Sequence, residues 1–157
     1  MEHQVYLGLG SNLGDREENI RKAIALIAER VGEVTRQSSL IETEPWGYES
    51  DNKFVNGVIL VETTLTPRQV LKATQKIERE LGKRRRHATT RVQSSIYHDR
   101  PIDIDILLFD DLHIDEPELK IPHPLMQERD FVMIPLREIC DAITYADPEP
   151  SRWHDND

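Results

Sequence analysis

Cysteine is nearly absent from this sequence of 157 residues, and Cys140 is its single copy. One cysteine excludes an internal disulfide and any zinc site built from several thiolates, which agrees with a reducing compartment. Apolar runs of membrane length are also missing, and the first residues carry no basic region ahead of their short apolar run. We therefore expect a soluble protein of the cytoplasm with no membrane partner.

Basic residues are in the minority, with 20 against 29 acidic residues and a net charge of −9. This charge argues against general binding of nucleic acid by the whole surface, so an anionic ligand needs a local basic patch. Such a patch occupies residues 83–100, with Asp99 as its only acid. Its cations are Lys83, Arg84, Arg85, Arg86, Arg91 and Arg100. Taken alone, the segment is better explained as a solvated charge run or a weak nucleic-acid arm than as a ligand site.

Hydrophobic periodicity predicts strands over residues 5–9, 34–41 and 54–63, and a last strand within residues 100–109. A helix is expected from Asp15 to Gly32, with Asp15 and Glu18 as a capping box, and another from Thr66 to Gly82, capped by Thr66 and Gln69. The glycines at positions 8, 10 and 14 do not have dinucleotide-fingerprint spacing. We expect them to permit a tight turn and a close approach of the backbone to a ligand or a neighbouring chain.

This order of elements predicts an α+β protein with a ferredoxin-like βαββαβ sandwich, a mainly antiparallel sheet and helices on one face. A C-terminal extension follows, with a short helix over residues 131–139 that Pro135 interrupts early. The length fits one domain, which we expect over residues 1–147, and the polar residues 148–157 are expected to form a flexible tail.

Two aspartates share one face of the last predicted strand, where isoleucine and aspartate alternate between Arg100 and Phe109. Asp103 and Asp105 are then about 6.6 Å apart along the strand and repel each other unless a cation lies nearby. Mg²⁺ suits this pair, because it is usually held by one or two carboxylates with water and substrate phosphates. Arg100 could clamp a phosphate beside it. The alternative is the solvated face of an edge strand.

The chain resembles one family closely, the hydroxymethyldihydropterin pyrophosphokinases of folate biosynthesis. The motifs that carry this resemblance occur in family order over nearly the whole chain. They are Gly10-Ser11-Asn12-Leu13-Gly14, Glu42-Thr43-Glu44-Pro45-Trp46-Gly47, Phe54-Val55-Asn56, Gln75-Lys76-Ile77-Glu78, Arg100-Pro101-Ile102-Asp103-Ile104-Asp105-Ile106-Leu107, Ile121-Pro122-His123-Pro124 and Glu128-Arg129-Asp130-Phe131-Val132.

The resemblance implies transfer of the β,γ-diphosphoryl group of ATP to the hydroxymethyl group of a reduced pterin, with AMP as the other product. It implies two Mg²⁺ ions held by Asp103 and Asp105, which form the catalytic set together with Arg85 and Arg100. The residues implied for ATP are Gln75, Glu78, Lys83, Arg85, Arg100, Ile106, His123 and Arg129. The residues implied for the pterin are Thr43, Pro45, Trp46, Phe54, Asn56, Asp103 and Phe131.

Three residues of the pterin set have side chains suited to stacking on a flat ring or to forming hydrogen bonds with its edge. Phe54 and Phe131 would sandwich a flat ring, and the Asn56 amide, on the same strand face as Phe54, can both donate to and accept from its edge. As isolated residues, both phenylalanines could instead belong to the core.

The chain departs from the family in its basic segment. Lys83 stands where the family more often has arginine, and a longer insert ending in Tyr97 and Arg100 replaces a short stretch that contains tryptophan. Tyr97 is a candidate to close over the site in place of that tryptophan.

Two other functions remain open from the residues alone. One is a two-metal phosphodiesterase or nuclease, which would normally need more clustered metal ligands than this chain offers. The other is a ferredoxin-like nucleotide-binding or RNA-binding module without catalysis, against which the net charge and the absence of a stacked aromatic signature argue. We expect no nucleic-acid partner and a monomer or weak homodimer.

Overall fold

An antiparallel sheet forms the centre of the protein. The structure is a computed structural model that describes residues 2–44, 53–82 and 101–140. The strands are β1 (His3–Ser11), β2 (Glu33–Gln37), β3 (Ile41–Thr43), β4 (Phe54–Thr63) and β5 (Asp103–Phe109). They lie in the order β2-β4-β1-β5, and β3 also pairs with β4. The last predicted strand therefore lies beside the first, and the two longest strands occupy the middle of the sheet, as the ferredoxin-like prediction requires.

The strand expected over residues 34–41 is instead two short strands, β2 and β3, so its predicted extent was wrong. The Ser38 side chain lies at the break and takes part in the ladder. Its Oγ accepts a hydrogen bond from the Val58 N–H at 2.9 Å, while the Ser38 N–H donates to the Val58 carbonyl at 2.9 Å. A serine side chain that binds backbone groups in this way competes with the hydrogen-bond ladder of the sheet.

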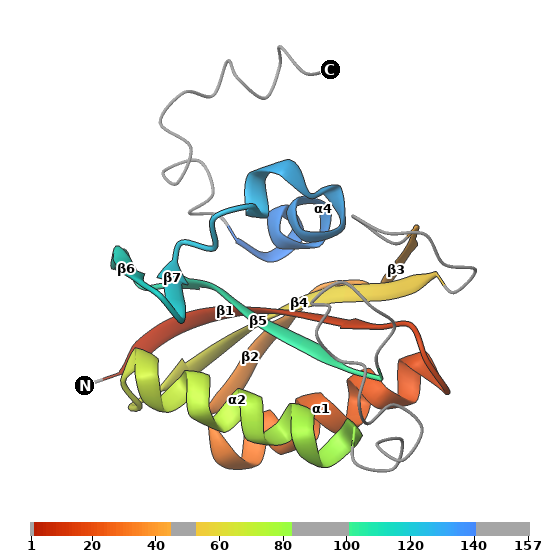
Figure 1. Cartoon of the computed structure of the whole chain (residues 1–157), viewed down its shortest axis with the longest axis horizontal. Helices are drawn as coiled ribbons and strands as arrows, with labels where there is room; N and C mark the ends of the chain where they lie inside the picture. Colours follow the sequence, from red (N-terminus) through yellow and green to blue (C-terminus); the bar gives the residue numbers. More distant parts are fainter. Residues whose placement is uncertain (1, 45–52, 83–100, 141–157) are drawn as a thin grey trace.

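Helices α1 (Arg16–Arg30) and α2 (Pro67–Gly82) cover one face of the sheet (Figure 1). Both predicted caps are confirmed. The Asp15 carboxylate accepts from the Glu18 N–H at 3.2 Å. At the second helix, the Thr66 N–H donates to the Gln69 side chain at 2.9 Å and the Gln69 N–H donates to the Thr66 hydroxyl at 3.2 Å. This reciprocal capping box fixes where α2 begins.

Helix α4 (Asp130–Ile139) covers the opposite face of the sheet (Figure 1). Pro135 lies inside this helix and does not interrupt it, which corrects the sequence-based expectation. Four apolar side chains of α4 are buried against the sheet, namely Val132, Met133, Leu136 and Ile139. Each such burial contributes about 1.5–3 kcal/mol, which together exceeds the roughly 3 kcal/mol that an internal proline costs.

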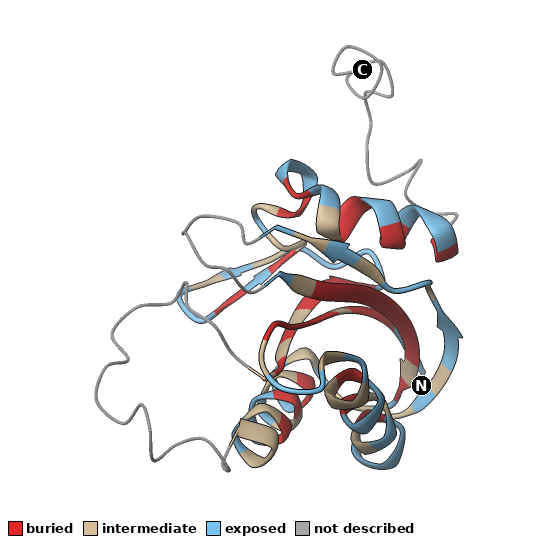
Figure 2. Ribbon diagram, turned by 90° about the vertical axis from the view of Figure 1, so that its right-hand side faces the viewer, coloured by how far each residue is buried: buried red, intermediate tan, exposed pale blue. Residues whose placement is uncertain are grey.

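Both faces of the sheet therefore carry a buried core. The α1/α2 face holds alternate residues of the central strands, such as Val5, Leu7 and Leu9, and the α4 face holds Tyr6, Val58 and Leu107. Figure 2 shows this burial along the central strands and on the helix surfaces turned toward them. The result is a sheet between two helical layers.

A short hairpin and a single turn of 3-10 helix join β5 to α4. The hairpin consists of β6 (Ile114–Glu116) and β7 (Leu119–Ile121), and the turn, η2, covers Met126–Glu128. Neither element was predicted.

Among the described residues, no helix is long and apolar enough to cross a membrane.

Candidate active site

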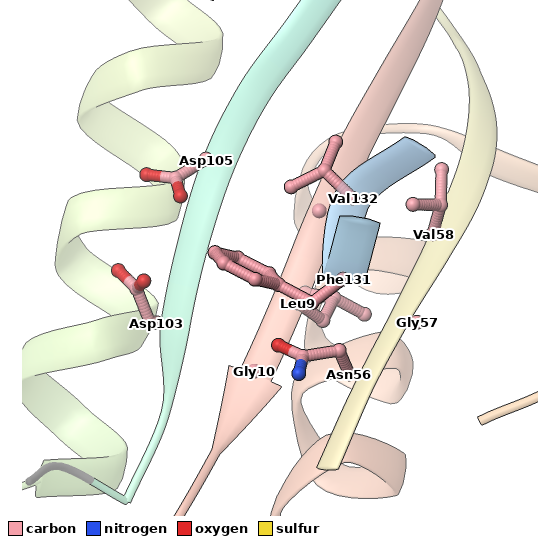
Figure 3. Close-up of a pocket in the computed structure, with 10 residues that line it drawn as sticks. Leu9, Gly10, Asn56, Gly57, Val58, Asp103, Asp105, Phe131 and Val132 are labelled. Carbon is pink, nitrogen blue, oxygen red and sulfur yellow. The ribbon is translucent and has the colours of Figure 1, made fainter. Parts of the chain in front are cut away.

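A pocket opens on the α4 face of the sheet, where two rows of residues run across three strands (Figure 3). In the first row Gly10 of β1 pairs with Asp103 of β5 on one side and with Asn56 of β4 on the other. In the second row Gly8 pairs with Asp105 and Val58. The two glycines therefore form a floor without side chains between an acidic edge and an amide edge.

The acidic edge of the pocket is the aspartate pair. Asp103 and Asp105 are both half-buried and line the same pocket, and they project to the same side of β5 in Figure 3. The period-two pattern of β5 produces this arrangement, because the intervening Ile104 and the flanking Ile102 and Ile106 are buried in the core on the other face. The sequence prediction that both carboxylates share one face is confirmed.

The amide edge is fixed by a hydrogen bond between neighbouring strands. Asn56 is only 5% exposed, and its Nδ2 donates to the Thr43 hydroxyl oxygen at 2.8 Å. Thr43 is opposite Phe54 in the register of β3 and β4, so three of the seven residues predicted for the pterin, Thr43, Phe54 and Asn56, are neighbours. The hydrogen bond ties the amide of β4 to the Thr43 side chain of β3.

The wall opposite the floor comes from α4. Phe131 and Val132 line the pocket, and Figure 3 shows the Phe131 ring reaching toward the space between the aspartates and Asn56. The guanidinium of Arg129 lies 5.5 Å from the centre of the Phe131 ring, and this side chain is only 9% exposed. A buried cation stacked on an aromatic ring beside the pocket favours anionic ligands.

His123 lies in the Pro-flanked turn before η2. Its backbone N–H donates to the Leu107 carbonyl of β5 at 3.0 Å. Burial lowers the pKa of its imidazole, the Arg129 cation lowers this pKa further, and the Asp103 carboxylate acts in the opposite direction. The ring is therefore neutral at pH 7. Because Nδ1 accepts from the Leu125 N–H at 3.3 Å, the proton is on Nε2 and that atom is a donor.

The residues predicted for ATP on α2 lie on the other face of the sheet. Gln75 is exposed, whereas the half-buried Glu78 reaches the open edge of β5, where its carboxylate accepts from the Ile104 N–H at 2.6 Å. The Ile106 side chain is buried in the core on the α1/α2 face, so any contact of this residue with ATP falls to its backbone. The structure does not bring Gln75 or Ile106 to the pocket.

Five predicted site residues lie outside the described residues: Pro45, Trp46, Lys83, Arg85 and Arg100. Tyr97 lies there as well. Conversely, the structure adds pocket residues that were not assigned to the site, among them Gly8, Gly10 and Val58. The two glycines gave a signal in the sequence, because a side chain is missing at alternate positions of a strand.

The 7,8-dihydro-6-hydroxymethylpterin-pyrophosphokinase family profile matches residues 6–141. The chain belongs to this family. A curated relative from Porphyromonas gingivalis, named 2-amino-4-hydroxy-6-hydroxymethyldihydropteridine pyrophosphokinase, is 45% identical over 148 residues, which are 94% of this chain and 97% of the relative. The relative of the same name from Bacillus subtilis is 42% identical over 144 residues, 91% of this chain and 81% of its own length. The chain is accordingly a pyrophosphokinase.

The fold is also that of solved members of the pyrophosphokinase family. A Plasmodium falciparum HPPK-DHPS wild-type crystal structure matches 88% of this chain with a TM-score of 0.66 at 16% identity. This chain spans 41% of that longer chain. Membership of the family decides against the interpretation as a noncatalytic RNA-binding module.

Proposed function

We propose that this pyrophosphokinase transfers the β,γ-diphosphoryl group of ATP to the hydroxymethyl oxygen of 6-hydroxymethyl-7,8-dihydropterin. The main support for the proposal is that Asp103, Gly10 and Asn56 form a continuous row across β5, β1 and β4. The carboxylate that would bind a metal ion therefore lies across the pocket from the amide that would form hydrogen bonds with the edge of a heteroaromatic ring. A ring held beside Asn56 would direct its substituent across the bare floor toward the carboxylates.

The bond changes follow from the products. The hydroxymethyl oxygen forms a bond to the β-phosphorus of ATP, and the bond from that phosphorus to the α,β-bridging oxygen breaks. AMP leaves with the bridging oxygen, and the hydroxyl proton is released. Such a displacement depends on charge neutralisation and alignment more than on a strong base, so no covalent nucleophile is assigned.

Asp103 and Asp105 fit Mg²⁺. Both are half-buried carboxylates on one face of a strand. Within the described ranges, no group of three or more His, Cys, Asp or Glu side chains could hold a metal ion, so the ligands from the protein would be these two carboxylates. A site with two carboxylates suits Mg²⁺, which completes its octahedron with water and substrate phosphates. The ions, of which we expect two, supply charge neutralisation at the phosphates when bound.

The pterin end of the pocket combines stacking with a polar edge. We propose that Phe131 and Phe54 stack on the two sides of the ring, that Asn56 binds its edge and that Thr43 holds this amide in place. Pro45, Trp46 and Asp103 complete the proposed pterin set. The position of Phe131 in the pocket and the hydrogen bond from Asn56 to Thr43 support these roles.

Cations and donors around the aspartate edge suit a polyphosphate. We propose that Arg129 and the Nε2–H of His123 bind phosphate oxygens, together with Lys83, Arg85 and Arg100. In the sequence, the basic segment 83–100 follows directly on α2 and ends shortly before β5. We therefore propose that ATP approaches along the β5 edge, with Gln75, Glu78 and Ile106 on its side of the site.

A timed assay with Mg²⁺, ATP and the reduced hydroxymethylpterin tests this function. AMP that forms only when the pterin is present supports the proposal, and an Asn56→Leu variant should lose most of this AMP because its side chain cannot bind the ring edge. ADP as the nucleotide product would indicate single phosphoryl transfer. Phosphodiester cleavage with magnesium but no pterin would revive the nuclease alternative.

We also propose that the enzyme works in the cytoplasm, where ATP is available, as a monomer or weak homodimer without a nucleic-acid or membrane partner. Sedimentation velocity over a range of protein concentrations would measure the oligomeric state. A stable tetramer, or co-sedimentation with RNA at physiological salt, would contradict this part of the proposal.

A further inference from the structure

Gly10 occupies the centre of the row that joins the two ends of the pocket. Its neighbours across the strands are Asp103 and Asn56, and residues directly opposite in antiparallel strands have Cβ atoms about 4.5–5.5 Å apart. Any side chain here would therefore stand between the carboxylate and the amide. The backbone of Gly10 does not itself demand glycine, because Gly14 is the one glycine with a positive φ among the described residues.

The space above Gly10 is taken by one atom of Asn56. A Cβ added at Gly10 would lie 2.7 Å from Oδ1 of Asn56 and 3.4 Å from Cδ1 of Phe54. The first distance is too short for a nonbonded contact, while the second is tight but tolerable. A methyl group at this position would consequently push the end of the Asn56 side chain away, and the backbone would not have to move.

The Asn56 amide is held from its other end. Nδ2 donates to the Thr43 hydroxyl at 2.8 Å, so Oδ1 is directed away from β3 and over Gly10 (Figure 3). A shift of Oδ1 would therefore either rotate the amide and break the bond to Thr43 or move the whole side chain along the strand. Both changes alter which atoms face the pocket.

We infer that Gly10 is a positioning residue for pterin recognition, because its missing side chain sets where the Asn56 amide lies. The inference rests on the proposed function for its ligand but makes its own prediction about the free protein. Gly10 acts through Asn56, so the two positions are coupled. Gly8, two residues earlier on the same strand face, is not part of this coupling. The three atoms nearest to a Cβ there would be Leu107 side-chain carbons, at 3.5 Å or more.

The first test measures the free protein by NMR. Gly10→Ala should shift the side-chain amide resonances of Asn56, whereas Gly8→Ala, which adds the same methyl group without touching Asn56, should leave them in place. Unchanged Asn56 resonances in Gly10→Ala would overturn the inference. This result does not depend on whether the protein binds a pterin.

The second test is a double-mutant cycle on Gly10→Ala and Asn56→Ala. Calorimetry with the reduced pterin, Mg²⁺ and a non-hydrolysable ATP analogue should give a Kd about tenfold or more higher for Gly10→Ala, while the Kd of the analogue alone changes less than about twofold. In the Asn56→Ala background the same glycine substitution should have almost no further effect. Additive effects would contradict a role through Asn56.

If Gly10→Ala does not fold, the double variant Gly10→Ala/Asn56→Ala still tests whether Gly10 acts through Asn56. Asn56→Ala removes the oxygen that the new methyl group would meet, so it should restore folding, and failure to restore it would overturn the inference. Failure of the wild-type protein to bind the pterin would instead refute the proposed function and leave the NMR result to stand on its own.

Discussion

Individual residues of the site differ in how far the sequence could assign them. The aspartate pair was predictable because a period of two places both carboxylates on one face of β5, and the structure confirms that they line one pocket. Arg129 was assigned only through the family resemblance. Its burial and its position 5.5 Å from the Phe131 ring depend on how α4 packs, which no local pattern encodes.

The aspartates should matter for transfer and not for folding. Asp105→Asn keeps the size of the side chain and removes one of two like charges, so the midpoint of thermal unfolding without metal should stay the same or rise slightly. Transfer should fall by about 10²–10³-fold or more, a loss typical of removing one strong electrostatic contact to a transition state. The turnover rate and the thermal midpoint are measured on the same preparation. Unfolding of this variant would instead indicate a structural role for the carboxylate.

His123 should make stability depend on pH. Its pKa is lowered in the folded protein by burial and by Arg129, whereas an unfolded histidine titrates near 6.5. The unfolded chain therefore binds this proton more readily, and the free energy of unfolding is fully retained above about pH 6.5 and decreases as the pH falls below it. His123→Gln should flatten this decrease. Urea denaturation in EDTA between pH 5 and 8 measures it, and equal slopes for both proteins would contradict the account.

Elements were predicted well where local chemistry fixes them and poorly where packing decides. The capping pairs at Asp15 and Thr66 fixed where the first two helices begin. The break at Ser38 was not foreseen, because it depends on a hydrogen bond to Val58 of the neighbouring strand. Helix α4 continues past Pro135 because its buried face packs on the sheet, which becomes evident only once the sheet has been assembled.

Within the described part of the sheet, β5 is an edge strand, and Glu78 of α2 is bound to its backbone between the two aspartates. Glu78→Ala would leave the half-buried Ile104 N–H without the carboxylate that it now contacts at 2.6 Å, at a cost of about 1–3 kcal/mol in the free energy of unfolding. Hydrogen exchange at the Ile104 amide should become faster.

The matched control for Glu78 is Glu80→Ala on the same helix. This substitution removes a surface ion pair with Arg30 and should cost less than about 1 kcal/mol. It should not change exchange at Ile104. Equal effects of the two substitutions on that amide would show that the contact between Glu78 and β5 has no special importance.

At the scale of the whole molecule, the two faces of the sheet differ in that only the α4 face carries the pocket described above. The α1/α2 face carries the core of the central strands, whereas on the α4 face a core around Tyr6, Val58 and Leu107 gives way to the pocket at Gly8 and Gly10. Helix α4 belongs to both parts, because it contributes core side chains and also Phe131. Stability and pterin binding should therefore be linked through this helix.

Two substitutions in α4 test that link. Leu136→Ala removes a fully buried side chain between α4 and the sheet and should cost about 2–5 kcal/mol. Because the helix also carries Phe131, the KM for the pterin should increase more than the KM for ATP. Ile134→Ala, at a position that is 53% exposed on the same helix, should change the free energy of unfolding by less than about 0.5 kcal/mol and leave both KM values unchanged. Equal increases in the two KM values for Leu136→Ala would contradict the link.

The most direct test of the central claim follows the phosphorus atoms themselves. ATP labelled at the β-phosphorus or at the γ-phosphorus is incubated with the enzyme, Mg²⁺ and the reduced hydroxymethylpterin, and the product is separated from the nucleotides. The account predicts that both labels move to the pterin in equal amounts while AMP accumulates. Transfer of the γ label alone, with the β label retained in ADP, would contradict it.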